Sequence, residues 1–259
     1  MVRPILEKIL AAKRNAVEKA KQAVPLPELM RRAREADPPR DFKAALMAKG
    51  LSVITEVKKA SPSRGILAEQ VDVAHLARRY EEGGASAVSV LTEEEFFLGR
   101  LDDLRQVKSA VQLPILRKDF IFDPYQVWES RAAGADAALL IASMLELVPL
   151  RQLILLARQL HVTPLVEVHD VVELGRALDA GADVIGVNAR SLINFAVDLR
   201  VPLSLAPVIP PGMIKVAESG IRTRDDVVQL QQAGYDAVLV GETLMRAKDP
   251  TRKLRELVG

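Results

Sequence analysis

The sequence contains no cysteine, only three histidines and no long uninterrupted hydrophobic run. Without cysteine the chain forms no disulfide and offers no thiolate, which fits a reducing compartment such as the cytoplasm. The histidines (His75, His161 and His169) lie far apart and form no HExxH-like pair, so we expect no metal site. The longest apolar runs are too short to span a bilayer, and no signal peptide is visible. We therefore expect a cytoplasmic protein with no membrane partner.

The chain also has little excess charge of either sign. Its 36 Lys and Arg residues stand against 34 Asp and Glu residues, which leaves a formal net charge of +2. A net charge this close to zero argues against nucleic acid as the main partner, although it does not exclude local basic patches. Apolar residues, by contrast, make up 49% of the 259 residues, which is enough for one large core.

Two helices are predicted ahead of the main part of the chain. Residues 4–22 place apolar side chains at helical spacing with lysine and arginine on the other face, and residues 26–35 form a second, proline-flanked helical segment. An amphipathic helix can also serve a membrane or a partner protein, but the apolar stripe is modest. We expect residues 1–48 to be a helical extension that packs on the main domain.

After this extension, short apolar segments recur in two interleaved series. One series follows a Gly-Ala or Gly-Tyr turn at residues 84–88, 134–138, 181–185 and 234–238, and the other covers residues 51–54, 113–116, 163–166 and 213–216. Each turn glycine stands where a helix C-cap belongs, and the gaps between segments are long enough for a helix. The alternation predicts an α/β protein, a (β/α)₈ TIM barrel with an N-terminal helical extension, in which residues 1–259 form a single domain. No G-x-G-x-x-G segment follows any strand, which argues against a dinucleotide-binding fold.

Charged residues gather where these apolar segments end, which is where barrel enzymes carry their chemistry. The residues at these ends are Glu56, Lys58, Arg117, Lys118, Asp119, Glu167, His169, Asn188, Arg190, Glu218 and Glu242. Any one of them is equally well explained as a surface loop charge, but their recurrence favours a shared pocket. In that pocket Lys118 is a candidate general acid or, alternatively, a Schiff-base nucleophile.

The last two strand ends carry a second signal. Ser219-Gly220 and Gly241 each precede helical sequence, as in phosphate sites built from backbone N–H groups and helix dipoles. A branched side chain at Gly220 is therefore expected to block the phosphate. Ser61-Pro62-Ser63, in the long loop after the first strand, could add hydroxyl donors or could be an ordinary proline turn.

Five segments carry a resemblance to a known family. Residues 53–63, 116–121, 165–169, 186–190 and 216–221 resemble the signature segments of indole-3-glycerol phosphate synthases, and they occur in family order. The Glu-x-Lys-x-x-Ser-Pro-Ser and Arg-Lys-Asp-Phe motifs are highly specific together, and the resemblance covers essentially the whole chain. It implies a barrel enzyme of tryptophan biosynthesis, a carboxy-lyase. Its reaction converts 1-(2-carboxyphenylamino)-1-deoxyribulose 5-phosphate into indole-3-glycerol phosphate, carbon dioxide and water.

The resemblance also implies roles for particular residues. Lys118 would be the general acid at the substrate carbonyl, Lys58 and Glu167 would serve dehydration and proton removal, and Glu56 would position or share in that relay. Which lysine serves which step stays open. The implied substrate contacts are Asn188, Arg190, Phe97 and Phe120. The implied phosphate contacts are Ser61, Ser219, Gly220, Gly241 and Glu242, the last through its backbone N–H alone.

The chemistry of this reaction bears on cofactors and on the acid. Because re-aromatisation drives the decarboxylation, no electron sink is needed, so we expect no cofactor and only a phosphorylated small molecule as ligand. Contacts with other tryptophan-pathway enzymes are left open. The acid must supply a proton near neutral pH, so we expect Lys118 to lie in an electropositive, partly desolvated site that lowers its pKa.

Three other functions compete with this hypothesis. The first is an aldolase-type lyase that uses Lys118 as a Schiff base, and the second is a phosphorylated-sugar isomerase, for which an Asp with a Cys would be expected. The third is a non-catalytic phospho-ligand binder or an engineered scaffold, which has no use for Lys58, Lys118 and Glu167. The chain departs from the family pattern at Arg100, Ser143, Ala189 and Ser191, which affects expected rate and substrate fit but removes no proposed catalytic group.

Overall fold

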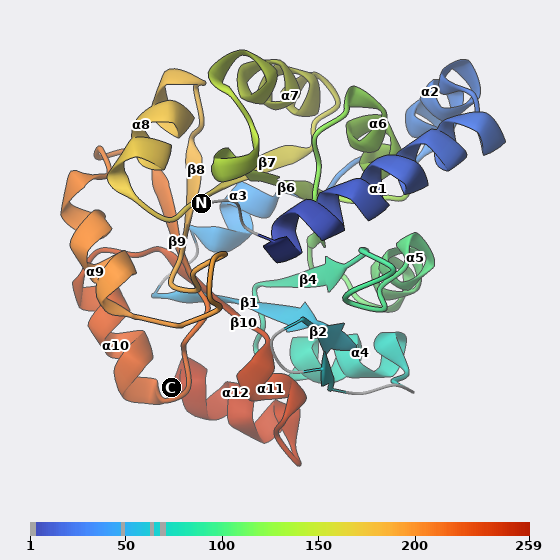
Figure 1. Ribbon diagram of the computed structural model, residues 1–259. Coiled ribbons are helices and arrows are strands. Elements are labelled where there is room, and N and C mark those ends of the chain that lie inside the picture. The colour runs from blue at the N-terminus through green and yellow to red at the C-terminus, as the bar shows by residue number, and fades with distance from the viewer. Residues whose placement is uncertain (1–3, 48–49, 63–64, 68–70) are drawn as a thin grey trace.

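A closed barrel of eight parallel strands forms the centre of the molecule (Figure 1). The computed structural model describes residues 4–47, 50–62, 65–67 and 71–259. In chain order the strands are β1 (Ser52–Val57), β4 (Ala87–Leu91), β5 (Ile115–Lys118), β6 (Ala137–Ile141), β7 (Thr163–Val168), β8 (Val184–Asn188), β9 (Ile214–Glu218) and β10 (Ala237–Val240). Each pairs with the next, and β10 pairs with β1 to close the ring. The predicted (β/α)₈ barrel is confirmed.

Helices follow the strands and surround the barrel. The outer helices are α4 (Val73–Glu82), α5 (Leu101–Ala110), α6 (Pro124–Ala132), α7 (Leu147–Gln159), α8 (Val171–Asp179), α9 (Arg200–Leu205), α10 (Arg224–Gln232) and α12 (Pro250–Val258). Short helical turns follow two strands, η1 (Ala142–Met144) after β6 and α11 (Glu242–Met245) after β10, and a third, η2 (Ala206–Val208), continues from α9. The turn glycines that follow helices, such as Gly84 (φ 95°) and Gly181 (φ 90°), adopt the left-handed conformation that side chains disfavour, as their C-cap assignment requires.

Alternation along each strand divides the core into two layers. Odd-numbered and even-numbered positions point to opposite faces, so one set packs under the helices and the other fills the barrel. On β7, for example, Val166 and Val168 belong to the outer layer, whereas Leu165 belongs to the inner one. This division matters for function because the inward positions continue upward into the barrel mouth.

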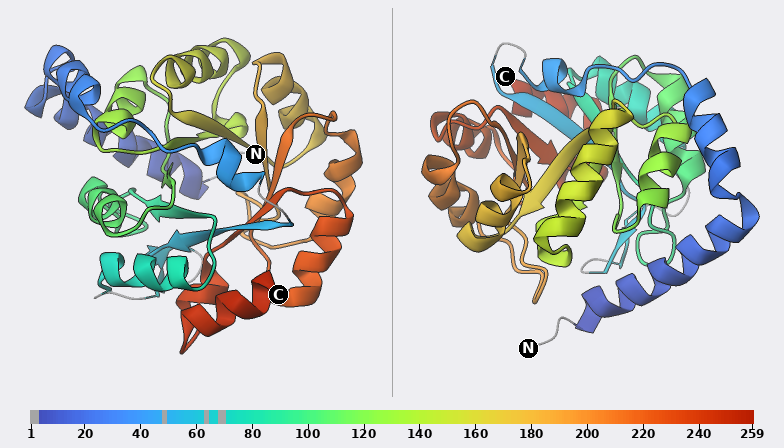
Figure 2. Two further views of the ribbon diagram at one scale, coloured as in Figure 1. Left: turned by 180° about the vertical axis from the view of Figure 1, so that it is seen from behind. Right: turned by 90° about the horizontal axis from the view of Figure 1, so that it is seen from above.

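Three helices precede the barrel and cover both of its ends. The helix α1 (Pro4–Ala23) places Leu6 and Ile9 in the inner layer and reaches the loop after β5, so it lies across the carboxyl-terminal end. The helix α2 (Leu26–Glu35) packs along α6. The helix α3 (Phe42–Leu46), which the sequence analysis did not predict, buries Phe42 and Leu46 against the inner layer at the opposite end. Opposite views show α1 in front in Figure 1 and α3 in front in the left panel of Figure 2.

A small hairpin follows β1 and was also not predicted. Its strands, β2 (Ala60–Ser61) and β3 (Gly65–Ile66), pair antiparallel beside the barrel. Ser63 of the predicted Ser-Pro-Ser turn lies outside the described residues. Among the helices in the described ranges, none combines the length and apolar character needed to span a membrane.

Candidate active site

Five barrel strands each aim a polar side chain into the carboxyl-terminal mouth. Because the alternation places Ile54, Leu116 and Leu165 inward, the residues two positions later also point inward, and the same holds on β8 and β9. The side chains placed in this way are Glu56, Lys118, Glu167, Asn188 and Glu218. Together with Lys58, which follows β1, they line one cavity of about 530 Å³. The structure therefore brings the four proposed catalytic residues into a single site.

Lys118 contacts two of the carboxyl groups in this cavity. Its Nζ lies 2.9 Å from Glu167 Oε2 and 3.1 Å from Glu218 Oε2, and only 13% of the side chain is exposed. Burial by itself would lower the pKa of Lys118, but the carboxylates of Glu167, Glu218 and Glu56 outweigh it and raise that pKa. The expectation of an electropositive site with a lowered lysine pKa was wrong. The surroundings are electronegative, and Lys118 is held as an ammonium.

The two carboxylates on Lys118 differ in their protonation. Burial raises the pKa of Glu167, but Lys118, His169 and a hydrogen bond from Asn188 more than compensate and lower it below its usual range. For Glu218, burial and the neighbouring Glu167 prevail over Lys118 and raise the pKa to about 7. At neutral pH Glu167 is thus a carboxylate, whereas Glu218 exchanges its proton. Paired carboxyl groups whose pKa values are driven apart are a frequent basis for acid and base roles in enzymes.

Glu218→Gln is expected to change how stability depends on pH. In the wild-type protein Glu218 has a higher pKa folded than unfolded, so the stability it contributes is full below about pH 4.5 and falls as pH rises toward about 7. The variant lacks this loss. In urea unfolding at several pH values, the variant should match the wild type near pH 4.5 and exceed it at pH 8. A constant difference between the two proteins over that range would contradict the raised pKa.

Glu56 and Lys58 form a second pair on the opposite side of the cavity. They lie on the same face of the chain, as the sequence predicts, with Lys58 Nζ 2.5 Å from Glu56 Oε1. Two inward glycines leave space for carboxylates here. A Cβ at Gly241 would approach Glu56 Oε1 to 2.2 Å, and one at Gly186 would approach Glu218 Oε1 equally closely. At these two positions the missing side chain is what allows the carboxyl groups to enter the mouth.

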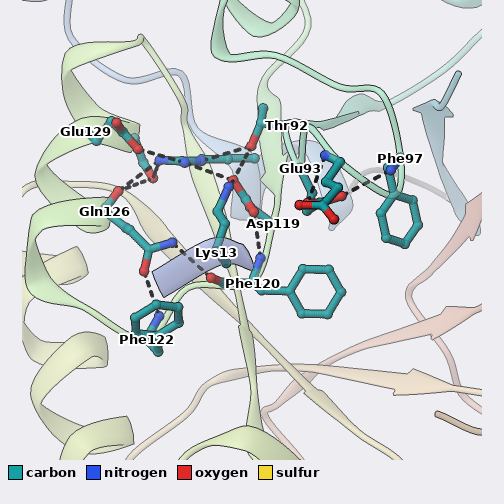
Figure 3. Close-up of polar contacts among 12 residues, drawn as sticks. Lys13, Thr92, Glu93, Phe97, Asp119, Phe120, Phe122, Gln126 and Glu129 are labelled. Carbon is teal, nitrogen blue, oxygen red and sulfur yellow. Dashed lines mark hydrogen bonds and ion pairs between the residues drawn. The ribbon is translucent and has the colours of Figure 1, made fainter. Parts of the chain in front are cut away.

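Aromatic side chains form one wall of the cavity. Phe97 and Phe120 both line it, with ring centroids 6.1 Å apart. The Phe97 loop is fixed by Glu93, whose buried carboxylate accepts hydrogen bonds from the backbone N–H groups of Phe96 and Phe97 (Figure 3). Asn188 lines the cavity from β8. Glu93 is not predictable as a buried residue from the sequence, because it stands in a run of acidic residues typical of an exposed loop.

The five residues predicted to contact phosphate (Ser61, Ser219, Gly220, Gly241 and Glu242) all line the cavity. The two helix N-termini predicted to hold the anion are not equivalent, however. The first turn of α10 is closed by its own capping box, in which Thr223 and Asp226 accept from each other's backbone N–H groups. Only α11, whose N-cap is Gly241, has no side-chain cap.

The geometry of Gly220 corrects a further expectation. Its φ is 84°, and a Cβ there would approach Val197 Cγ1 to 2.8 Å and Leu199 Cδ2 to 3.1 Å. A larger residue at Gly220 would therefore strain the loop and displace these two side chains, so it would not simply block a phosphate. The neighbouring Ser219 also has a positive φ of 68°.

Arginines surround this end of the cavity. Arg190 lines it and has its Nη2 3.2 Å from Glu242 Oε2, and Arg246 approaches the other oxygen of Glu242 to 3.3 Å. Arg222 also lines the cavity. The carboxylate of Glu242 is thus neutralised by two cations, which agrees with a phosphate contact made through its backbone alone. From the sequence, Arg222 is an alternative place for the anion, and Arg246 has no predicted role.

A buried network beside the cavity ties α1 to the residue after Lys118 (Figure 3). Lys13 Nζ lies 2.7 Å from Asp119 Oδ2, which also accepts from Thr92 Oγ1 and Arg117 Nη2. The other oxygen of Asp119 accepts from the Phe120 N–H. Burial raises the pKa of Asp119, but Lys13 and Arg117 lower it to about 2. Asp119 therefore fixes the backbone between Lys118 and Phe120.

Lys13→Met is expected to destabilise the protein. The substitution leaves Asp119 with Arg117 as its one remaining cation in a fully buried position, and breaking a buried ion pair costs about 3 kcal/mol or more. Lys8→Met on the exposed face of α1 is the matched control. Equilibrium urea unfolding should separate the two variants clearly. Equal unfolding free energies would show that the Lys13 contact adds nothing.

Arg117 and Glu218 are two strand-end residues that the sequence pattern places in the shared pocket without assigning them a role. Arg117 does not enter the shared pocket. It points outward between β5 and α6, where it bonds to Glu129 and the Gln126 carbonyl. Glu218 was given no role, yet it contacts Lys118. Its signal was present in the alternation, because Val216 is an inward residue two positions earlier.

A parallel eight-stranded barrel with lysines and glutamates buried together at its carboxyl-terminal mouth defines a (β/α)₈-barrel enzyme. Comparison with known proteins names the family. The family model described as indole-3-glycerol phosphate synthase matches residues 6–257. The chain belongs to the indole-3-glycerol phosphate synthase family.

Relatives of this chain carry the same description. The indole-3-glycerol phosphate synthase of Carboxydothermus hydrogenoformans is 46% identical over 98% of this chain and 99% of its own length. Indole-3-glycerol phosphate synthase 1 of Streptomyces coelicolor is 49% identical over 98% of this chain and 94% of its own. Because these relatives are covered almost completely, the similarity extends over the barrel and the N-terminal helices alike.

More distant solved structures share the fold alone. The 3-hexulose-6-phosphate synthase of Salmonella typhimurium superposes with a TM-score of 0.65 at 14% identity, over 80% of this chain and 97% of that one. Thiamine phosphate pyrophosphorylase of Pyrococcus furiosus gives a TM-score of 0.59 at 18% identity, over 82% and 95%. Both comparisons agree with the barrel topology.

Proposed function

We propose that this chain closes the indole ring of indole-3-glycerol phosphate, starting from 1-(2-carboxyphenylamino)-1-deoxyribulose 5-phosphate. The observation that carries the proposal is a buried Lys118 held between an ionised Glu167 and a proton-exchanging Glu218. Such an arrangement provides a proton donor and a proton acceptor within about one hydrogen-bond length of each other. The family membership supplies the substrate.

Condensation is the first step of the proposed mechanism. Lys118 donates a proton to the ribulose carbonyl oxygen while the anthranilate ring carbon that bears the carboxylate attacks the carbonyl carbon. A C–C bond forms and the carbonyl becomes a hydroxyl. The C–CO₂ bond then breaks, carbon dioxide leaves, and the electron pair restores the aromatic ring. No electron sink is needed, because re-aromatisation provides the driving force.

Dehydration completes the ring. Lys58 protonates the new hydroxyl, which leaves as water, and Glu167 accepts the proton that the ring gives up. Glu56, 2.5 Å from Lys58, positions that lysine. Without substrate, the neighbouring carboxyl groups raise the pKa of Lys118 and disfavour loss of its proton. During condensation, the alkoxide that develops on the substrate is a far stronger base, and it can accept that proton.

The remaining contacts orient the substrate. Phe97 and Phe120 provide an apolar wall for the anthranilate ring, and Asn188 and Arg190 hold polar groups. The phosphate is held by the backbone at Gly241 and Glu242 with Ser61, Ser219 and Gly220, and Arg222 and Arg246 add positive charge at that end. Holding the two reacting carbons near each other removes much of the entropic cost of ring closure.

The direct test is to incubate the purified protein with the substrate and record the fluorescence of the indole product. Steady product formation supports the proposal, and its absence from a folded protein would refute it. Borohydride addition during turnover distinguishes the aldolase alternative. A covalent adduct on Lys118, seen by mass spectrometry, would assign that lysine a Schiff-base role, whereas the proposed acid role predicts no adduct.

Chelation is expected to leave turnover unchanged. At the cavity each buried carboxylate already faces a lysine ammonium, Glu56 with Lys58 and both Glu167 and Glu218 with Lys118, so cations of the protein occupy the places where a metal would bind. Activity measured with and without EDTA should agree within error. Loss of activity that a divalent ion restores would contradict this prediction.

A further inference from the structure

His169 contacts Glu167 and is not among the described residues that line the cavity. It follows β7 two residues after Glu167, so alternation directs both side chains to the same side. Its Nδ1 is 2.9 Å from Glu173 Oε2 on α8, and its Nε2 is 3.5 Å from Glu167 Oε1. The His169 side chain is 14% exposed, and Glu167 and Glu173 are 2% and 7% exposed. One imidazole thus bridges two buried carboxylates.

The contacts of Glu173 fix which nitrogen of His169 carries a proton. Glu173 Oε2 also accepts the backbone N–H of His169 at 2.8 Å. Because a carboxylate oxygen has no proton to donate, it must also be the acceptor in its contact with Nδ1. Nδ1 is therefore protonated. Nε2 is shielded from solvent and makes no hydrogen bond to any described residue, while it faces a Glu167 oxygen. A bare lone pair there would repel the carboxylate, whereas an Nε2–H attracts it.

We infer that His169 is a positioning residue for Glu167: anchored by Glu173, it presents an Nε2–H to Glu167 Oε1 and fixes that carboxylate in its ionised form and orientation. This inference rests on the proposed role of Glu167 as the base. Lys118 holds the other oxygen of Glu167, at 2.9 Å, so the two cations fix the carboxylate from both sides.

The anchor of His169 is itself rigid. Glu173 lies in the first turn of α8, and its own N–H donates to the N-cap Asp170 at 2.8 Å. Three acidic residues face His169: Glu173 on α8, Glu167 on β7 and Glu218 on β9. Burial lowers the pKa of the imidazole, but these three residues outweigh it and raise that pKa. The arginines of α7 are engaged elsewhere, on the carbonyls of Asp179 and Gly181. Arg176 of α8 likewise donates to the Ala142 carbonyl.

Two substitutions separate the contacts of His169. Asparagine has an amide nitrogen at the place of Nδ1 and retains the Glu173 contact, but it has no group at Nε2. Glutamine has an amide N–H near the place of Nε2 and retains a neutral donor toward Glu167. We expect His169→Asn to lower kcat about tenfold, which corresponds to about 1.4 kcal/mol, with KM changed less than about twofold, because the attraction between the imidazolium and the Glu167 carboxylate is lost. His169→Gln should recover most of that loss.

His161→Asn is the matched control. His161 is exposed, and its φ of 57° lies in the left-handed region, which asparagine tolerates well. This variant should have wild-type kcat and KM. A common loss in all three variants would point to stability, and thermal unfolding of each protein checks that.

Nitrogen-15 NMR of the wild-type imidazole tests the inference without activity. We expect both nitrogens of His169 to be protonated at pH 7, and Glu167→Gln to lower the pKa of the ring. An unprotonated Nε2 at pH 7, or a folded His169→Asn protein with wild-type kcat, would overturn the inference. If Glu167→Gln itself retained wild-type kcat, the proposed base would be wrong. If Glu167→Gln were inactive and His169→Asn normal, only the role of His169 would fall.

Discussion

Lys118→Ala is expected to lower kcat by about a hundredfold or more, in the range that general acids contribute, while the barrel stays folded. Lys118 is the one cation that contacts both Glu167 and Glu218, and no other ammonium in the described cavity replaces it there. Without a donor at the carbonyl, the attacking ring carbon would generate an unstabilised alkoxide. The measurement is kcat from indole fluorescence, with circular dichroism as the check on folding.

Lys118→Arg is the informative companion. It retains the positive charge between the two carboxylates, but a guanidinium does not release its proton at physiological pH. If Lys118 acts as an acid, the arginine variant should be almost as slow as the alanine variant. If the ammonium serves only as a fixed charge, the arginine variant should be much faster. Retention of more than about a tenth of wild-type kcat by Lys118→Ala would remove the acid role altogether.

Glu167→Gln is expected to lower kcat by about 10²–10⁴-fold, with a smaller change in KM. The amide preserves the shape of the side chain but cannot accept the proton that the ring gives up. Glu94→Gln, on an exposed part of the loop after β4, is the control and should behave as the wild type.

The pH dependence of turnover provides a second check on Glu167. Its pKa lies below the ordinary value because Lys118 and His169 outweigh burial, so the carboxylate needed for catalysis is present above that lowered pKa and is lost only as pH falls through it. The acid limb of the wild-type profile should therefore fall below about pH 4.5, the unperturbed value. An acid limb near neutral pH that vanished in Glu167→Gln would contradict the assignment.

The fold was predictable because its signals are local and repeated. Eight apolar segments, four of which follow a glycine turn, predict eight strands, and all eight form. The short helix α3 was missed because its function is tertiary: Phe42 and Leu46 close the bottom of the barrel, and five residues are too few for a helical period to be recognised. The hairpin β2–β3 has only two residues in each strand and shows no pattern at all.

The site was predictable in its membership but not in its electrostatics. Motif and alternation place Glu56, Lys58, Lys118 and Glu167 at one mouth, and the structure puts all four around one cavity. The predicted direction of the Lys118 pKa shift was wrong, because that direction depends on how many carboxyl groups surround the ammonium. That number includes Glu218, which reaches Lys118 from a strand 100 residues later. Arg117 shows the reverse case, since a strand-end charge adjacent to Lys118 points to the opposite face.

The glycines illustrate why spacing alone does not assign a role. The sequence suggested that Gly220 and Gly241 present backbone N–H groups to a phosphate and that a side chain at Gly220 would block it. In the structure a Cβ at Gly220 would meet Val197, and one at Gly241 would meet the Glu56 carboxylate. Which neighbour approaches a glycine follows from packing across the barrel and is not visible in a strand-end motif.

The most direct test of the central claim is the stoichiometry of a single turnover. With substrate labelled by carbon-13 in the anthranilate carboxyl, excess enzyme should release one labelled carbon dioxide and form one indole-3-glycerol phosphate for each substrate consumed. The same experiment with Lys118→Ala should give neither product at a comparable rate. Consumption of substrate without labelled carbon dioxide, or carbon dioxide release without indole, would contradict ring closure by this site.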